Sequence, residues 1–262
     1  MEIIAVDDHS VDRTPHILKS IADSRFNVKF ISGDPLPPGW YGKAFALHQA
    51  SRYAKGEYLL FTDADPVFKP NAITTAVYQM QNAKLDVLTL MPGGKFGSFW
   101  ECVVQPVIFA FIAGLTRFRK INSQESRRAM GIGAFLMFRR SVYEGLGGHE
   151  RVKQKVVEDI ELAKYAKRDG FKLLIADGKS IFSIRMYYSL KEICLGWRKN
   201  MFVALKRSIF RAFYYLIIVL GFQVTSYGVF FFNLFTGQAT HLTILSALGV
   251  LLVWTVGKNL CE

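Results

Sequence analysis

The sequence predicts an α/β fold, a mostly parallel β-sheet with helices on both faces, followed by a C-terminal transmembrane helical hairpin. Over residues 1–188, short apolar runs alternate with helix-length amphipathic segments, which is typical of parallel strands joined by crossover helices. Acidic residues directly follow two of the apolar runs. The stretch from Ala212 to Gly257 contains no Asp, Glu, Lys or Arg, and it is long enough for two membrane-crossing helices.

The first part of the chain follows this alternation closely. Met1–Val6 is a predicted strand, and because the chain opens directly on it, we expect no N-terminal leader. Thr14 and Pro15 suit the start of a helix that reaches about Ala22. The loop Asp34–Lys43 is rich in Pro and Gly, as loops that shape a site often are. Further strands are predicted at 28–31, 58–61 and 86–91, and further helices at about 44–54 and after Asn71.

The middle of the chain is less regular. Phe96–Thr116 is apolar, contains Glu101 and is broken by Pro106. Its uncharged core is too short to span a bilayer, and its pattern suits either a helix in the membrane interface or one packed against the sheet. A basic stretch follows it. We then expect strands at about 131–138, 171–176 and 181–187, and helices from Val156 and over about 189–205.

The formal charge of +12 is compatible with nucleic-acid binding, but its distribution indicates a membrane instead. Basic residues that flank a span mark its cytoplasmic side and attract anionic lipids. They gather just before the uncharged stretch: Arg185, Lys191, Arg198, Lys199, Lys206, Arg207 and Arg211. We therefore expect a multi-pass membrane protein with a cytoplasmic catalytic domain and no nucleic-acid partner.

The predicted organisation has three parts. A catalytic domain covers residues 1–188, an interfacial amphipathic helix covers 189–211, and a membrane region covers 212–262, with helices at about 212–235 and 242–257. A buried hairpin in a soluble core is the alternative for the last part. The three cysteines, Cys102, Cys194 and Cys261, form neither a metal-binding motif nor a disulfide framework.

Two carboxylates follow the predicted strand 58–61. Asp63 and Asp65 are spaced i, i+2, so they lie on the same side of an extended strand end. Two carboxylates this close repel each other unless a cation lies between them, which predicts a hard-metal site and a phosphate-bearing substrate. The alternative is an acidic turn ahead of the next helix. Asp7 and Asp8 also follow a strand, and ligands of parallel sheets bind at such ends, so the two pairs together predict a nucleotide site.

Asp159 is the candidate general base. It lies near the start of the helix predicted from Val156 and shares an apolar stripe with Val156, Ala163 and Ala166. A carboxylate on an inward stripe can face a cleft and accept a proton there. Favourable placement of an acid at the positive end of a helix explains the same position without catalysis.

Together, these blocks resemble glycosyltransferase family 2, which has the GT-A fold, in its membrane-bound branch of hopene- and carotenoid-associated glycosyltransferases. The resemblance covers about residues 2–210. The family's first strand and its Asn–Glu loop are missing, so we expect that the sequence begins late or is a fragment. The synthase motif Gln-x-x-Arg-Trp is also absent, which argues against a polymer synthase. The matching segments are Val6–Thr14, Gly39–Lys43, Asp63–Asp65, Gly147–Glu150, Glu158–Asp159, Arg185–Tyr187 and Gly196–Asn200.

The resemblance implies a role for each candidate residue. Asp7 and Asp8 would bind the base and ribose, Lys43 would lie near the base or diphosphate, and Asp63 would contact the nucleotide. Asp65, with Asp63, would hold Mg²⁺ or Mn²⁺, and Asp159 would deprotonate the acceptor with inversion at the sugar. The acceptor or diphosphate side would be lined by Gly148, His149, Glu158, Trp197, Arg198 and Lys199.

Simpler interpretations stay open for several of these residues. His149 also suits a turn in which it binds a carbonyl, Trp197 suits an interfacial anchor, and Arg198 and Lys199 suit lipid headgroups. The function expected is transfer of a hexose from a nucleotide sugar, a UDP-sugar first, to a hydroxyl or carboxyl of a lipid-like acceptor. The alternatives are a processive polysaccharide synthase and an inactive, membrane-tethered nucleotide-binding fragment.

Overall fold

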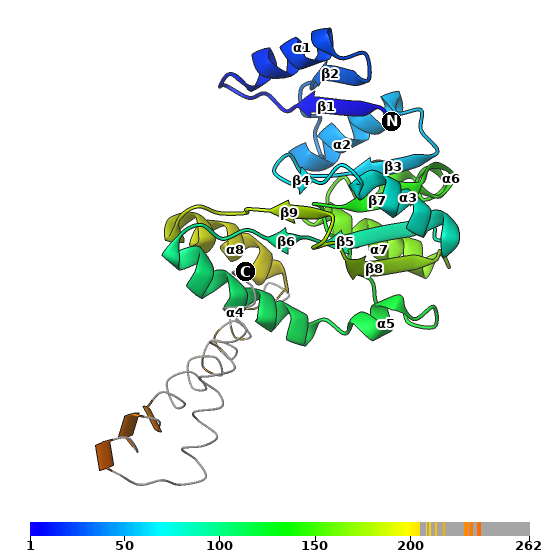
Figure 1. Ribbon diagram of the computed structural model, residues 1–262. Helices are drawn as coiled ribbons and strands as arrows, with labels where there is room; N and C mark the ends of the chain where they lie inside the picture. The colour runs from blue at the N-terminus through cyan, green and yellow to red at the C-terminus, as the bar shows by residue number, and fades with distance from the viewer. Residues whose placement is uncertain are drawn as a thin grey trace. The chain divides into compact units, whose positions relative to one another are not determined.

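The computed structural model describes residues 1–204 and the single positions 208, 210, 213, 217, 228, 229, 231, 232, 235 and 236 (Figure 1). Apart from those positions, the predicted membrane helices at about 212–235 and 242–257 lie outside the described residues. Within the described residues, no helix is long and apolar enough to cross a bilayer. The chain forms two compact units. The first contains residues 1–93 and 117–184, and the second contains residues 94–116 and the chain from Arg185 onward.

The first unit begins with a two-stranded parallel sheet. Strands β1 (Ile3–Asp7) and β2 (Val28–Ser32) pair with Asp7 opposite Ser32, and α1 (Thr14–Ser24) connects them. The carboxylate of Glu2 accepts hydrogen bonds from the backbone N–H groups of Lys55 (2.6 Å) and Gly56 (3.0 Å). These bonds connect the start of β1 to the turn that precedes the next strand. The elements agree closely with the predicted alternation.

A four-stranded sheet forms the centre of this unit, in the order β3–β7–β5–β8. Strands β5 (Val87–Met91) and β8 (Leu173–Asp177) are parallel, but β7 (Leu136–Arg139) is antiparallel to both β5 and β3 (Tyr58–Phe61). The prediction of a mostly parallel sheet is therefore wrong for the central sheet, which is mixed. The physical reason is the connection from β5 to β7, which passes through two helices over residues 92–135 and is not a single crossover helix.

A small three-stranded sheet holds the turn that follows β3. Its order is β4–β9–β6, formed by β4 (Val67–Phe68), β9 (Phe182–Ile184) and β6 (Gly93–Gly94). Phe68 stacks on Phe182 with ring centroids 5.4 Å apart, and Phe135 packs against Phe182 at 5.5 Å. Residues 62–66 are therefore anchored by β3 at one end and by β4 at the other.

The core of this unit lies around β7. Phe138 of β7 is fully buried, and α7 (Glu158–Arg168) buries Leu162, Ala163 and Ala166 in the same hydrophobic cluster. The predicted apolar stripe of α7 is thus its inner face. The remaining helices of the unit are α2 (Gly42–Tyr53), α3 (Ala72–Asn82), α5 (Phe118–Asn122), α6 (Arg140–Gly145) and the 3₁₀ helix η1 (Gly148–Val152).

The second unit contains α4 (Phe99–Leu115) and α8 (Leu190–Ala204), which pack against each other (Figure 1). Helix α4 continues through Pro106, which is buried, although we expected the proline to break it. The first unit leaves out Gly94–Thr116, and the predicted bounds of 1–188, 189–211 and 212–262 stay a prediction. An ion pair between the buried Glu101 of α4 and the partly exposed Arg185 joins two segments of the second unit that are far apart in the sequence.

Candidate active site

The first turn of α2 brings a lysine to the carboxyl end of β3. The ammonium group of Lys43 lies 2.5 Å from Oδ1 of Asp63 and 3.1 Å from Oε1 of Glu158, the first residue of α7. Glu158 is buried and Asp63 is about one-third exposed. A single cation thus joins β3 to α7. The structure brings together Lys43 and Asp63, two candidates for the nucleotide site, and adds Glu158, which was expected on the acceptor or diphosphate side, as the second partner of Lys43.

The loop before β7 closes over this ion pair at Gly133. A Cβ atom at Gly133 would lie 2.8 Å from Nζ of Lys43 and 3.3 Å from both Oδ2 of Asp159 and Oδ2 of Asp63. The two carboxylates and the ammonium group therefore meet around one glycine. Only a residue without a side chain leaves the space for this approach.

Hydrogen bonds hold this loop in place. The hydroxyl of Thr62 donates to the carbonyl of Ala134 at 2.9 Å. The hydroxyl of Thr89, a buried residue of β5, donates to the carbonyl of Phe135 at 3.0 Å and accepts from the N–H of Ile132 at 3.0 Å. Neither Gly133 nor Thr89 was among the site residues predicted from the sequence. A glycine just ahead of a strand was the available signal for a close approach, and the buried threonine carried no signal of its own.

The surroundings of Asp159 disfavour the ionised form of its carboxyl group. Burial, followed by the charge of Glu158, raises its pKa to about 6 from an ordinary value of 3.8. The N–H of Ile160, which donates to Oδ1 at 2.7 Å, and the ammonium group of Lys43 act in the opposite direction. A carboxyl group with a pKa near 6 is ionised at neutral pH and is a stronger base than an ordinary aspartate.

Burial and neighbouring charges also shift the pKa values of Lys43 and Asp65. Burial lowers the pKa of Lys43, but the charges of Glu158 and Asp63 outweigh it and hold that pKa above its ordinary value. Burial, followed by repulsion from Asp63, raises the pKa of Asp65. Lys43 is therefore a permanent cation in this cluster. A further positive charge near Asp65 would stabilise its ionised form.

A divalent cation fits these residues. In the part of the chain that the structure describes, no three His, Cys, Asp or Glu side chains form a complete metal cage. Mg²⁺ typically takes only one or two carboxylates from the protein and completes its shell with substrate phosphates and water. Asp65, together with Asp63, matches that donor set. The raised pKa of Asp65 means that its ionised form is disfavoured, and a bound cation would stabilise that form.

The acidic residues at the end of β1 lie beside the helix that carries Lys43. The Oδ2 atom of Asp8 lies 2.8 Å from the position of a Cβ at Gly42, the first residue of α2. Asp7 is buried. Its Oδ2 accepts a hydrogen bond from the N–H of Ser10 (3.3 Å), and its Oδ1 has no partner among the described residues. A buried carboxylate oxygen without a partner is suited to a ligand donor such as a base N–H or a sugar hydroxyl.

His149 and Gly148 belong to the core of the first unit. The Nδ1 atom of His149 lies 2.7 Å from the hydroxyl of Tyr143, and its ring packs on Phe61 with centroids 4.6 Å apart. Burial, followed by the nearby positive charges of His48 and Lys43, lowers the pKa of His149 to about 3, so the ring is neutral. The structure favours the simpler interpretation of a structural histidine, with Tyr143 in place of the expected turn carbonyl.

The other predicted residues lie in the second unit. The ring of Trp197 packs against Phe109 at 5.8 Å and Tyr187 at 6.4 Å, and Arg198 is exposed. Lys199 is part of α8, but its side chain lies outside the described residues. The roles of these three residues stay predictions.

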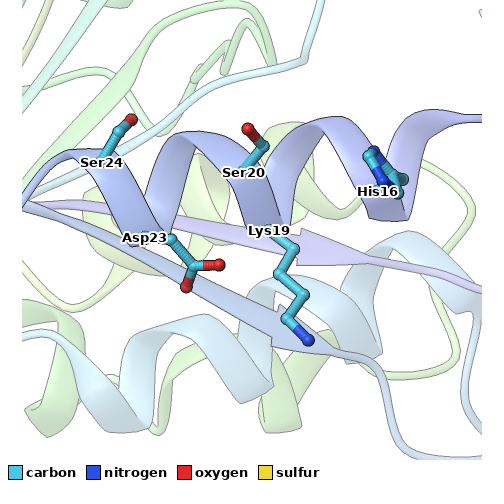
Figure 2. Close-up of a pocket in the computed structure, with 5 residues that line it drawn as sticks. All are labelled: His16, Lys19, Ser20, Asp23 and Ser24. Atoms are coloured by element: carbon cyan, nitrogen blue, oxygen red, sulfur yellow. The ribbon is translucent and has the colours of Figure 1, made fainter.

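A hollow on α1 is not part of this cluster. Figure 2 shows that a single helix lines it and that none of the predicted site residues contributes to it. Its lining residues are exposed: His16, Lys19, Ser20, Asp23 and Ser24.

A family model described as glycosyl transferase family 2 matches residues 1–147, more than half of the chain, and the protein belongs to this family. The predicted family is thereby confirmed.

Among curated proteins, the 4,4'-diaponeurosporenoate glycosyltransferase of Staphylococcus haemolyticus is 23% identical over 206 residues. The match covers 78% of this chain and 54% of the relative, so the chain spans about half the length of the curated relative it matches. The relative is a carotenoid-associated transferase by name, as the resemblance predicted.

Two solved structures are also similar. S. aureus TarS is 18% identical with a TM-score of 0.49, covering 73% of this chain and 32% of TarS. Glucosyl-3-phosphoglycerate synthase from Mycobacterium tuberculosis, in complex with Mn²⁺, UDP and glucosyl-3-phosphoglycerate, is 18% identical with a TM-score of 0.47, covering 79% of this chain and 68% of that protein.

Proposed function

We propose that this protein transfers a hexose from a UDP-sugar to a hydroxyl or carboxyl group of a lipid-like acceptor, with inversion and with the assistance of Mg²⁺ or Mn²⁺. One observation carries the proposal. In a member of glycosyltransferase family 2, a carboxyl group with a raised pKa, Asp159, lies with Asp63 and Lys43 around Gly133. The base candidate and the diphosphate-binding candidates thus form one cluster.

The proposed roles follow from charge and position. Asp159 is ionised at neutral pH and accepts the proton of an acceptor hydroxyl as that oxygen attacks the anomeric carbon. Lys43, a permanent cation, stabilises negative charge on the departing diphosphate, and Asp7 binds the donor through its unpaired carboxylate oxygen. A divalent cation held by Asp65 and Asp63 would supply Lewis-acid stabilisation of the leaving group.

Features of the sequence support the proposed acceptor and the proposed location of the protein. The uncharged stretch from Ala212 to Gly257 and the basic residues before it support a membrane protein with a cytoplasmic catalytic domain and a lipid-like acceptor. The matched relative is named 4,4'-diaponeurosporenoate glycosyltransferase, and this name supports an acceptor that bears a carboxylate.

A donor screen tests this function. The full chain, purified in detergent, is incubated with nucleotide sugars and lipid hydroxyl or carboxyl acceptors, with and without Mn²⁺. We expect metal-dependent transfer from a UDP-sugar, and a loss of at least about 10²-fold in Asp159→Asn, with UDP binding by calorimetry nearly unchanged. Glu161→Gln is the matched control, since Glu161 pairs with Lys164 on the polar face of the same helix.

The outcomes separate the alternatives. Full activity of Asp159→Asn would refute the role of the base. A long-chain product would favour a polysaccharide synthase over single transfer. If UDP with Mn²⁺ does not bind at all, the inactive-fragment alternative is favoured and the proposed function fails.

A further inference from the structure

Over residues 99–109, helix α4 buries its two polar side chains after Trp100 and exposes four apolar ones. Glu101 is 0% exposed and Gln105 is 1% exposed. On the other side, Phe99 is 69% exposed, Trp100 46%, Val103 47% and Val107 37%. At 100° per residue these four apolar side chains fall within one face of the helix, which we call the α4 apolar stripe. A helix in water has the opposite arrangement, whereas helices that contact lipid turn their polar groups toward the protein.

The orientation of α4 is fixed by an ion pair in which the carboxylate is buried and the arginine is partly exposed. Both carboxylate oxygens of Glu101 bind Arg185, at 2.8 Å and 2.9 Å. The same carboxylate accepts the backbone N–H groups of Gly97 (3.2 Å) and Ser98 (2.9 Å) at the start of the helix. Rotating α4 to bury its stripe would break these four hydrogen bonds, two of which join opposite charges, and this is unfavourable. The exposure of the stripe is therefore built into the unit.

The charge around the stripe suits an anionic surface. Over residues 94–116 and 185–204, the second unit contains five basic residues and only two acidic ones, Glu101 and Glu192. Glu101 is buried, and the carboxylate of Glu192 accepts hydrogen bonds from the N–H of Tyr188 and the hydroxyl of Ser189. Packed against α4, helix α8 exposes Leu195 between two exposed cations, Lys191 and Arg198. Apolar side chains beside lysine and arginine are typical of helices at the surface of an anionic membrane.

The length of the chain places this unit close to the predicted membrane region. The uncharged stretch begins at Ala212, and α8 ends at Ala204. Eight residues reach at most about 29 Å even when fully extended. If the uncharged stretch enters a bilayer, α8 and the helix packed on it lie within reach of that bilayer. A soluble protein partner is not required to explain the stripe.

We propose that the α4 apolar stripe lies in the headgroup and upper acyl region of a bilayer that contains anionic lipids. The stripe then forms a second membrane contact, separate from any transmembrane segment, and its tryptophan sits at the depth that tryptophan prefers. This inference goes beyond the proposed function and does not depend on glycosyl transfer. The competing occupant is a second copy of this chain.

Tryptophan fluorescence tests the position of the stripe. A variant that keeps Trp100 alone is reconstituted into vesicles of phosphatidylcholine and phosphatidylglycerol in which the lipids carry a quencher near the headgroup or deep in the acyl chain. We expect a blue-shifted emission and stronger quenching by the shallow label, because an interfacial helix lies about 5–10 Å into the boundary. The other tryptophans are replaced by phenylalanine: Trp40, Trp197 and Trp254.

A matched control uses α3 of the first unit. Tyr78 is an exposed aromatic residue on that helix. In a chain without the native tryptophans, the tryptophan introduced by Tyr78→Trp should be quenched by the lipid labels at most about half as strongly as Trp100. Val103→Glu in the Trp100 variant should reduce the quenching of Trp100, because it places a charge in the stripe. UDP binding by calorimetry, measured on the same samples, reports the state of the donor site independently.

Two results would overturn the inference. Equal quenching of the tryptophans at positions 100 and 78 would show that the stripe does not contact lipid. A blue-shifted Trp100 that lipid labels do not quench, in a particle with the mass of two chains, would assign the stripe to a dimer. Neither result bears on whether the protein transfers a sugar, so the failure of this inference and that of the proposed function are distinguishable.

Discussion

The pKa of Asp159 predicts an unusual pH dependence for the chemical step. With a pKa of about 6, the base is about 90% ionised at pH 7 and about 10% ionised at pH 5. The single-turnover rate with a hydroxyl acceptor should therefore fall about tenfold between pH 7 and pH 5. An aspartate with the ordinary pKa of 3.8 would lose almost nothing over this range. The assay is rapid-quench transfer at saturating donor, metal and acceptor.

Two substitutions should move this acid limb in opposite directions. The charge of Glu158 raises the pKa of Asp159, so Glu158→Gln should shift the limb to lower pH. The charge of Lys43 lowers the same pKa, so Lys43→Met should shift the limb to higher pH, whatever each variant does to the maximal rate. Glu161→Gln should leave it in place. Shifts of the same sign, or a wild-type rate that is equal at pH 5 and pH 7, would refute the assignment of Asp159 as the base.

Four further predictions concern other residues. Asp65→Asn should lower metal-dependent turnover by about 10²-fold or more and weaken UDP–Mn²⁺ binding in calorimetry; unchanged metal dependence would contradict its role. His149→Ala should lower the free energy of unfolding by about 2–4 kcal/mol in urea titrations, and a loss of activity without loss of stability would argue for a catalytic histidine. Gly133→Ala should lower the transfer rate by displacing the groups around it, whereas Gly145→Ala, where a Cβ meets nothing within 4 Å, should not. The pKa of Glu101, lowered to about 2 from 4.5 mainly by its arginine partner, means that this group adds stability above about pH 4.5 that is lost as the pH falls toward 2; Glu101→Gln should remove this component from acid-unfolding curves.

Much of the secondary structure could be predicted because its signals are local. The apolar run Tyr58–Phe61 and the Thr14–Pro15 helix start depend on neighbouring residues, and both elements begin where expected. The direction of β7 could not be predicted in this way. It depends on how residues 92–135 return to the sheet, and no local pattern records the direction of a strand relative to its neighbours.

Some residues of the candidate site could likewise be predicted from local patterns, and others could not. Asp7, Asp63 and Asp159 could be named because acids at strand ends and on an inward helical stripe are visible in the sequence. The pairing of Lys43 with Glu158 could not, because two residues far apart in the chain meet there. His149 was ambiguous for a similar reason, since its partner Tyr143 lies on a different helix and burial is a property of the whole core.

The sequence by itself determined the family, most of the longer helices and strands, and the identity of the acids available for chemistry, because each of these is written in short-range patterns of polarity and spacing. Only the tertiary structure decided which charges face each other. It raised the pKa of Asp159 through burial beside Glu158, and it turned the apolar stripe of α4 outward by burying Glu101 against Arg185. Electrostatic energies depend on distance and burial in three dimensions, and neither quantity can be read from positions along a chain.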